Sequence, residues 1–581
     1  MDEMGSFRVG GEIENPGRLR QWRRVLADCF GRRDAFRRRS RMRLSVAETV
    51  AGRRRASVRG VQRTALALFI AALSSAITAD SRLHAQDPRL ASLDSLRTMG
   101  HGPREERAGE TDSVPRLELG SCPFERGAWA DAVTLECGWL VVPESRALPS
   151  GRTLRLAVAV MRAAAPSLPP IVLLQGGPGL SGLDAFLPAL ATTPLPRMRD
   201  VVVYDQRGAG HSEPALCPDY NRRRREALAA DAGRGTALER EAPVIRSCLA
   251  TLRDHGIDPS AYTTAESAAD LVDLRHALRY QSWDVYGHSH GALQALAALA
   301  LDPAGIRSVV LDRPVKPGPY RAELPLRIQR ALNRLFSACA ADAGCRTAFP
   351  DPAADLAALV ETLDARPITV PQAAGPATEF VLDGAMLIHA LAGGLDAHAR
   401  MGWIPFLLHE LRSGDWEQAA RELAGWAGGR SSDAPATVSM MPCNDQYGAR
   451  ATAVEDSVLA AVSPPVRSIA RIRSVRTCAL WTDRTEDASL LMPTGSQTPV
   501  LILVAEYDVG GASPEDGRSI ANLLGNGTLV ELPAEGHADS ARPGTCVRSI
   551  MFQFWQEPMR PVDISCVAGM PGVRFVTSGT R

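Results

Sequence analysis

The stretch Gly287-His288-Ser289-His290-Gly291 decides the fold of this chain. It lies between the short run Trp283-Asp284-Val285-Tyr286, which predicts a buried strand, and residues 292–301, which are small and predict a helix. A Gly-x-Ser-x-Gly turn in this setting is the nucleophile-elbow pattern, in which the serine takes strained backbone angles between two close-packed elements. We therefore expect the hydroxyl of Ser289 alone at the carboxyl edge of a parallel sheet, beside a helix N-terminus that favours an anion.

Two glycine-rich loops precede this turn, and each follows a short apolar run that predicts a buried parallel strand. The run 171–174 ends in Gln175-Gly176-Gly177-Pro178-Gly179, and the run 201–204 ends in Asp205-Gln206-Arg207-Gly208-Ala209-Gly210-His211-Ser212. The first loop can turn a backbone N–H inward as half of an oxyanion hole, and the N–H of His290 would form the other half. Either loop alone also fits a strand end without chemistry, but the three elements in this order indicate an acyl-transfer site.

The partners of the serine are expected further along the chain, because this fold places nucleophile, acid and base in that order. The run 499–504 predicts a strand that leads into Ala505-Glu506-Tyr507-Asp508, and the run 529–532 leads into Pro533-Ala534-Glu535-Gly536-His537. His537 would take the serine proton, and Asp508 would fix the tautomer of the imidazole and stabilise its cation. Glu506 is the weaker candidate for the acid because it lies closer to the strand.

Together these motifs resemble the α/β-hydrolase peptidases of the prolyl iminopeptidase and tripeptidyl aminopeptidase type, above all their secreted, cysteine-containing branch. The resemblance covers roughly residues 120–568 and rests on Gln-Gly-Gly-Pro-Gly, Asp-Gln-Arg-Gly-x-Gly-x-Ser, Gly-x-Ser-x-Gly, Glu-Tyr-Asp and Gly-His. It implies an α/β-hydrolase fold with a mostly parallel sheet and an inserted helical cap. It also implies a serine peptidase that releases N-terminal residues, with Ser289 as nucleophile, Asp508 as acid, His537 as base, and Gly177 and His290 as oxyanion donors.

The chain departs from the family pattern at three places around the expected pocket. Gln175 stands where relatives often carry histidine, His288 and His290 flank the serine, and Val509-Gly510-Gly511 replaces a proline-containing turn. None of these changes removes a catalytic atom, so they bear on substrate preference more than on mechanism.

His288 and His290 also permit another interpretation, a metal site. Hydrolytic zinc loops that begin with His-x-His continue with an aspartate and a further histidine, whereas Gly291-Ala292 follows here. We therefore expect no metal, and the proposed chemistry requires no cofactor.

The N-terminal region reads as an export signal. Residues 1–63 carry 17 arginines against 7 acidic residues, and residues 64–79 form an uncharged apolar stretch followed by candidate cleavage points after Ala79 and Ala85. The stretch is shorter than the ~20 residues of a membrane span, so we expect a cleaved signal, no stable membrane span and a periplasmic or extracellular location. Met42 is an alternative start. The basic block lacks aromatic interleaving, so we do not expect nucleic-acid binding.

Cysteine usage supports export independently. Cys29 falls in the leader, and the ten others form an even set, which in an exported chain indicates disulfides. The sequence alone leaves the connectivity open, and some cysteines could instead be free buried thiols, but the resemblance favours pairing of neighbours. The neighbouring pairs are Cys122 and Cys137, Cys217 and Cys248, Cys339 and Cys345, Cys443 and Cys478, and Cys546 and Cys566.

The expected domain organisation has six parts. They are a basic leader and signal peptide at 1–85, a disordered lead-in at 86–115, the first part of the core at 116–314, a helical cap at 315–440, the second part of the core at 441–568, and a C-terminal tail at 569–581. Thr263-Thr264-Ala265-Glu266 predicts a capping box at a helix start. Helical periodicity without a strong strand marks residues 320–430 as the cap.

The substrate is expected to be a peptide or a small amide or ester. The resemblance implies that Asp445 is an acidic anchor for a free α-ammonium group, although an acidic residue in an exposed loop is the simpler interpretation. Two alternatives remain open from the residues alone. One is an esterase or lipase of the same fold, because the same triad serves both reactions, and the other is a secreted binding protein without activity. The sequence does not fix the oligomeric state.

Overall fold

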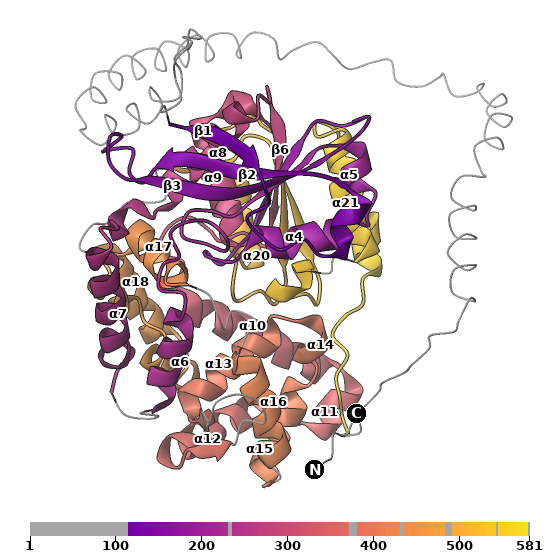
Figure 1. Cartoon of the computed structure of the whole chain (residues 1–581). Coiled ribbons are helices and arrows are strands. Elements are labelled where there is room, and N and C mark those ends of the chain that lie inside the picture. The colour runs from indigo at the N-terminus through magenta and orange to yellow at the C-terminus, as the bar shows by residue number, and fades with distance from the viewer. Residues whose placement is uncertain are drawn as a thin grey trace, which may run out of the picture. The chain divides into compact units, whose positions relative to one another are not determined.

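The computed structural model describes residues 114–578, apart from 231–234, 371–379, 415, 429–434, 483–490 and 542–543 (Figure 1). The expected signal segment, its cleavage points, Cys29 and nearly all of the expected lead-in lie outside these residues. Within them, no helix has both the length and the apolar character needed to cross a membrane.

A nine-stranded sheet forms the centre of the described chain, in the order β1-β2-β3-β5-β4-β6-β7-β10-β11. The first three strands pair antiparallel with their neighbours, and the six from β5 to β11 are parallel to one another. This mostly parallel sheet confirms the expected α/β-hydrolase architecture. The strands are β1 Arg116–Gly120, β2 Thr134–Pro143, β3 Thr153–Arg162, β4 Ile171–Leu174, β5 Val201–Tyr204, β6 Trp283–His288, β7 Ile306–Asp312, β10 Val500–Ala505 and β11 Gly527–Leu532.

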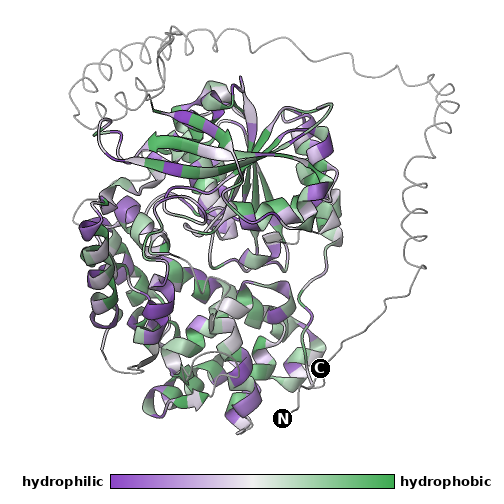
Figure 2. Ribbon diagram, viewed as in Figure 1, coloured by the Kyte–Doolittle hydropathy of each residue, from purple (hydrophilic) through white to green (hydrophobic). Residues whose placement is uncertain are grey.

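Helices cover both faces of the sheet, which is why three of its inner strands, β4, β5 and β10, are apolar along their whole length. Every residue of β4, β5 and β10 is buried, and Figure 2 shows these strands as hydrophobic along their length. Alternate residues of one strand enter different cores: Val172 packs with one cluster and Leu173 with the other. The first cluster includes α8 (Thr264–Ala277), α9 (His290–Leu301) and α20 (Pro514–Leu523), and the second includes α4 (Gly182–Leu190) and α21 (Thr545–Gln556).

A helical region between β7 and β10 has a hydrophobic core of its own. Residues 320–430 are mainly helical, and they also contain two three-residue strands, β8 (Ile368–Val370) and β9 (Phe380–Leu382), which pair antiparallel. The helices also continue beyond residue 440, which falls inside α17. They are α10 Leu324–Ala341, α11 Ala343–Ala348, α12 Pro352–Ala365, α13 Gly384–Leu395, α14 His398–Met401, α15 Ile404–Ser413, α16 Trp416–Gly428, α17 Thr437–Gln446, α18 Ala449–Ala461 and α19 Pro464–Arg467.

The sequence obscures this extension for a physical reason. Nearly every residue of α17 is buried and the helix contains Pro442, so its sequence has no amphipathic period. Two further helices, α6 (Tyr220–Ala230) and α7 (Ala237–Asp254), are inserted between β5 and β6 and pack against each other.

Five disulfides cross-link the part of the chain that the structure describes. They join the neighbouring cysteines that the resemblance favoured. Their Cα atoms are 4.8–5.9 Å apart. The Cys217–Cys248 disulfide ties the loop before α6 to α7, and the Cys443–Cys478 disulfide ties α17 to the 3-10 helix Val475–Leu480.

The predicted capping box at the start of α8 is only half formed. The hydroxyl of Thr263 accepts a hydrogen bond from the backbone N–H of Glu266, at 3.2 Å. The carboxylate of Glu266 does not return to Thr263; it accepts bonds from the backbone N–H and the guanidinium of Arg146. The charged partner, which lies 120 residues away in the chain, wins over the local one.

Candidate active site

Ser289 occupies a strained turn between β6 and α9. Its backbone angles are φ 56° and ψ −120°, a conformation that non-glycine residues rarely adopt. The turn needs both of its glycines. A Cβ at Gly291 would lie 2.3 Å from the carbonyl oxygen of Leu174, and one at Gly287 would lie 2.5 Å from that of Gly291. The structure thus forms the elbow that the sequence predicts.

His537 and Asp508 approach Ser289 from the ends of two neighbouring strands. Nε2 of His537 lies 2.9 Å from Oγ of Ser289, and its Nδ1 lies 2.9 Å from Oδ2 of Asp508. Asp508 follows β10 and His537 follows β11, and the N–H of Gly511 donates to Oδ1 of Asp508 at 2.6 Å. Glu506, the weaker candidate for the acid, accepts a bond from the N–H of Ala534.

The surroundings of His537 favour its protonated form. Burial opposes the charge on the imidazolium, but the charge of Asp508, the hydrogen bond to Asp508 and the charge of Asp396 together outweigh it. The pKa of His537 is therefore raised above its ordinary value, although the positive charge of Arg313 lowers it in part. The neutral imidazole can accept a proton from the serine, and the two carboxylates then stabilise the imidazolium that forms.

The glycine-rich loop after β4 presses directly against the serine. A Cβ at Gly176 would lie 2.6 Å from Cβ of Ser289, so only glycine fits there. The N–H of Gly176 donates to the side chain of Gln175 at 2.8 Å. The next residue, Gly177, has φ +116°, and its N–H has no hydrogen-bond partner among the described residues. His290 is the first residue of α9, so its N–H precedes the helical hydrogen-bond ladder.

The side chains of His288 and His290 do not converge on a common point. His288 bonds to Gln175 and Ser540, whereas Nε2 of His290 lies 3.2 Å from the hydroxyl of Thr264. Burial lowers the pKa of His290 to about 4. Among the described residues no group of three or more metal-binding side chains occurs.

Asp445 lies on α17 rather than in an exposed loop, and it is 2% exposed. Its Oδ1 accepts the backbone N–H of Thr264 at 2.9 Å, and its Oδ2 accepts the hydroxyl of that threonine at 2.5 Å. Thr264 is the first residue of α8. The carboxylate therefore satisfies an N–H at a helix start behind the elbow.

An acid that the sequence did not predict as part of the site comes from the helical region and faces the site. Asp396 follows α13, and its carbonyl oxygen accepts the N–H of Ala538 at 2.7 Å, next to His537. One carboxylate oxygen, Oδ1, is buried without a hydrogen-bond partner among the described residues. Burial, and then the charges of Asp508 and Asp539, raise the pKa of Asp396 to about 7, while His537 lowers it. No local motif marks this aspartate, because only the docking of α13 on the loop of His537 brings it here.

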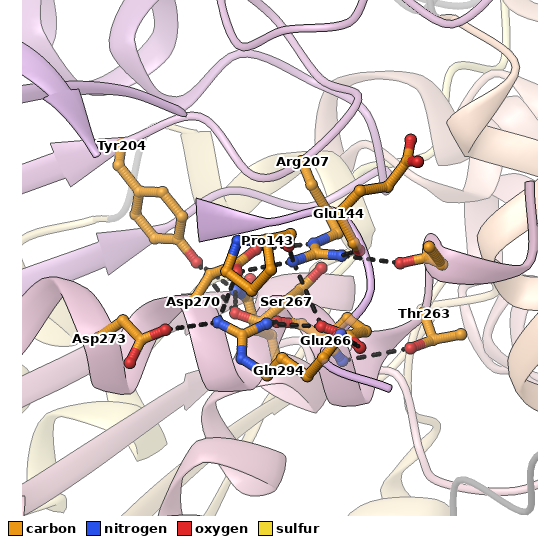
Figure 3. A network of polar contacts seen from close by, with 12 residues as sticks. Pro143, Glu144, Tyr204, Arg207, Thr263, Glu266, Ser267, Asp270, Asp273 and Gln294 are labelled. Atoms are coloured by element: carbon orange, nitrogen blue, oxygen red, sulfur yellow. Dashed lines mark hydrogen bonds and ion pairs between the residues drawn. The ribbon is translucent and has the colours of Figure 1, made fainter. Parts of the chain in front are cut away.

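The Asp205–Ser212 loop supports the site from behind. The carboxylate of Asp205 accepts the N–H groups of Gly182, Leu183 and His211, and so caps the start of α4. Arg207 is fully buried and enters the polar network of Figure 3, where it pairs with Asp270 of α8. Asp205 and Arg207 thus connect the loop after β5 to the start of α4 and to α8.

Comparison with known proteins agrees with this architecture. The family model described as alpha/beta hydrolase fold matches residues 169–379, and the model described as TAP-like protein matches residues 465–566. The resemblance that the motifs indicate is therefore confirmed at the level of the fold: the chain has the α/β-hydrolase fold.

Its relatives among characterised proteins carry peptidase and esterase names. Serine protease Hip1 of Mycobacterium tuberculosis is 31% identical over 221 residues, which cover 36% of this chain and 42% of that protein. Carboxylesterase B of the same species is 28% identical over 270 residues, covering 44% and 48%. Tripeptidyl aminopeptidase of Streptomyces coelicolor is 29% identical over 203 residues, covering 32% and 37%. The matched part of this chain spans less than half of the length of each relative.

Proposed function

Because this chain has the α/β-hydrolase fold, we propose that it is a serine peptidase that releases N-terminal residues from peptides. The observation that carries the proposal is the hydrogen-bonded series from Ser289 through His537 to Asp508, with both contacts at 2.9 Å. A strained serine, an imidazole and a buried carboxylate in this order are the elements of acyl-transfer chemistry.

The reaction proceeds in two halves. Oγ of Ser289 attacks the scissile carbonyl while Nε2 of His537 takes its proton, and Asp508 stabilises the imidazolium that forms. The N–H groups of Gly177 and His290 stabilise the oxyanion. His537 then protonates the leaving amine, the C–N bond breaks and an acyl-enzyme remains. Water, deprotonated by His537, attacks the ester, and the acyl product leaves as the serine recovers its proton.

Asp396 supports an aminopeptidase in preference to an endopeptidase. An aminopeptidase must bind a free α-ammonium group at a fixed distance from the scissile bond, and a carboxylate with an unpartnered buried oxygen supplies that contact. Asp445, the acid expected for this role, is engaged with Thr264. We therefore assign the ammonium contact to Asp396. The relative named tripeptidyl aminopeptidase supports the same class of reaction.

The second candidate is an esterase, which the similarity to carboxylesterase B favours. The same serine, histidine and aspartate cleave esters, and only contacts in the pocket divide the two activities. We further propose that the chain is exported, because its five disulfides persist only in an oxidising compartment.

A panel of fluorogenic substrates on the purified chain tests the function. The panel contains free and N-blocked mono-, di- and tripeptidyl amides beside short acyl esters, with Ser289→Ala as control. We expect cleavage of free-amine amides that is lost on blocking, and we expect the length of the best substrate to give the step length. Turnover of esters alone would establish the esterase. No turnover together with no fluorophosphonate labelling of Ser289 would leave a binding protein.

A further inference from the structure

Two departures from the family pattern, Gln175 and His288, contact each other beside the serine. Nδ1 of His288 lies 3.2 Å from Oε1 of Gln175. The same amide oxygen accepts the N–H of Gly176 at 2.8 Å. His288 therefore connects through one side chain to the loop that carries Gly177.

The other nitrogen of His288 reaches the loop of His537. Nε2 lies 2.7 Å from the hydroxyl of Ser540, three residues after His537, and that hydroxyl also lies 3.3 Å from the carbonyl oxygen of His537. The amide oxygen of Gln175 can only accept, so Nδ1 of the neutral His288 ring carries the proton and Nε2 accepts. The single hydroxyl hydrogen of Ser540 is then donated to Nε2 at 2.7 Å rather than to the more distant carbonyl oxygen of His537. The hydrogen bonds thus fix a single tautomer and a single ring orientation.

The ring of His288 also lies against the ring of His537. Their centroids are 5.2 Å apart, with an angle of 37° between the planes. Burial, and then the charge of His537, lower the pKa of His288 to about 4. It is thus a neutral ring at neutral pH, and it can lie beside the imidazolium form of His537 without charge repulsion.

We propose that His288 is a positioning residue that fixes the positions of the Gly176–Gly177 loop and of the His537 ring relative to Ser289. This inference rests on the proposed function, because it assigns His288 to the same reaction. The loop and the base come from strands that are not neighbours in the sheet, β4 and β11. A bridge of three side chains, Gln175, His288 and Ser540, links the loop after β4 to the loop of His537. Its central residue, His288, is the last residue of β6, the strand that leads into Ser289.

The bridge acts on the transition state more than on substrate binding. The oxyanion forms only after attack, and the imidazolium forms only with proton transfer, so misplacing either group slows chemistry. A displacement of about 1 Å can lower a rate by roughly 100-fold. Loss of the bridge should therefore lower kcat and leave KM nearly unchanged.

Four variants test this role on the full chain. His288→Leu removes both hydrogen bonds, whereas His288→Asn keeps a donor near the position of Nδ1 and should recover part of the activity. Gln175→Ala and Ser540→Ala each remove one end of the bridge. His255→Asn serves as control, because His255 is an exposed histidine bonded to the carbonyl oxygen of Thr251. The readouts are kcat and KM on the best substrate, with thermal melting as a check of folding.

We expect His288→Leu to lower kcat roughly 10- to 100-fold, and to combine non-additively with Gln175→Ala in a double-mutant cycle. A folded His288→Leu protein with kcat unchanged, a loss confined to KM, or additive effects would each overturn the role. If His288→Leu does not fold, the cycle between Gln175→Ala and Ser540→Ala decides. Coupling between them is expected, because both bond to His288, and independence would refute it. Failure of the proposed function is distinct, since the unmutated chain would then cleave no free-amine amide.

Discussion

Arg207 and Asp270 form a fully buried, bidentate ion pair. Nε of Arg207 lies 2.7 Å from Oδ2 of Asp270, and Nη2 lies 2.7 Å from Oδ1. Arg146 adds a further contact to the same carboxylate at 2.9 Å. Burial opposes the carboxylate charge, but the two guanidinium groups outweigh it, so the pKa of Asp270 is lowered. The pair joins the loop after β5 to α8, and so fixes the helix that lies behind the elbow.

Replacing Asp270 with asparagine should destabilise the fold severely. Asp270→Asn keeps the shape of the side chain but leaves Arg207 and Arg146 buried without the carboxylate that they share. Breaking one side of a buried pair costs about 3–5 kcal/mol. Urea unfolding at neutral pH measures the loss. The matched control is Glu226→Gln, which removes the exposed partner of Arg222 and should change stability by less than about 1 kcal/mol. Equal losses of unfolding free energy in the two variants would show that the buried ion pair contributes no more to stability than the exposed one.

Gly511 should tolerate no side chain, because atoms of the site surround the position that a Cβ would take. A Cβ there would lie 2.5 Å from the carbonyl oxygen of Arg313, 2.9 Å from Oδ2 of Asp508 and 3.0 Å from Cε1 of His537. Gly511→Ala must therefore displace the acid or the base. We expect roughly 100-fold lower kcat, together with slower fluorophosphonate labelling of Ser289.

A second glycine provides the control for that substitution. Gly425 is an exposed position in α16, and a Cβ there would meet no atom within 4 Å. Gly425→Ala should leave activity intact and stabilise the helix by up to about 1 kcal/mol. Full activity in Gly511→Ala would mean that the loop relaxes without moving Asp508 or His537.

The disulfides should contribute unequally to stability. The Cys217–Cys248 disulfide spans 31 residues and the Cys339–Cys345 disulfide spans 6. The chain-entropy model gives about 3.7 kcal/mol for the longer loop and about 2.2 kcal/mol for the shorter one. Removing each pair by double alanine substitution, and comparing urea unfolding midpoints, should show the larger loss for Cys217 and Cys248. The opposite order would mean that native packing outweighs loop entropy.

Local patterns predicted most of the sheet and the elbow. The apolar runs at Ile171–Leu174 and Val201–Tyr204 are strands at the predicted residues, because a buried parallel strand must be apolar on both faces. Ser289, Asp508 and His537 were found from their place after such strands. Their contacts follow from the parallel sheet, which brings the carboxyl ends of its strands to one edge.

The sequence did not predict the partners of three acidic residues, because those partners lie far away in the chain. Glu266 satisfies the local capping motif but binds Arg146, and Asp445 serves a helix start 181 residues away. Asp396 gains its place only when the helical region docks on the loop of His537. In each case the partner of the acidic residue is set by contacts that are distant in the sequence rather than by a local pattern.

The acid side of the pH profile should report the charge of Asp396. His537 must be neutral to accept the serine proton, so kcat/KM should fall as pH drops through its pKa, which is raised above its ordinary value. The charged groups that act on His537 are Asp508, Asp396 and Arg313, and the neutral ring of His288 lies beside it.

Asp396→Asn removes one negative charge that favours the imidazolium, so the fall in kcat/KM should move to lower pH. An ester or N-blocked substrate isolates this effect, because it presents no ammonium group. With a free-amine substrate the same variant should also raise KM, since the proposed ammonium contact is lost. The pKa of Asp396 is about 7, so the unmutated chain should show a broad transition from two coupled groups, and the variant a single sharper one. A profile that does not move, or that moves to higher pH, would show that Asp396 does not act on His537.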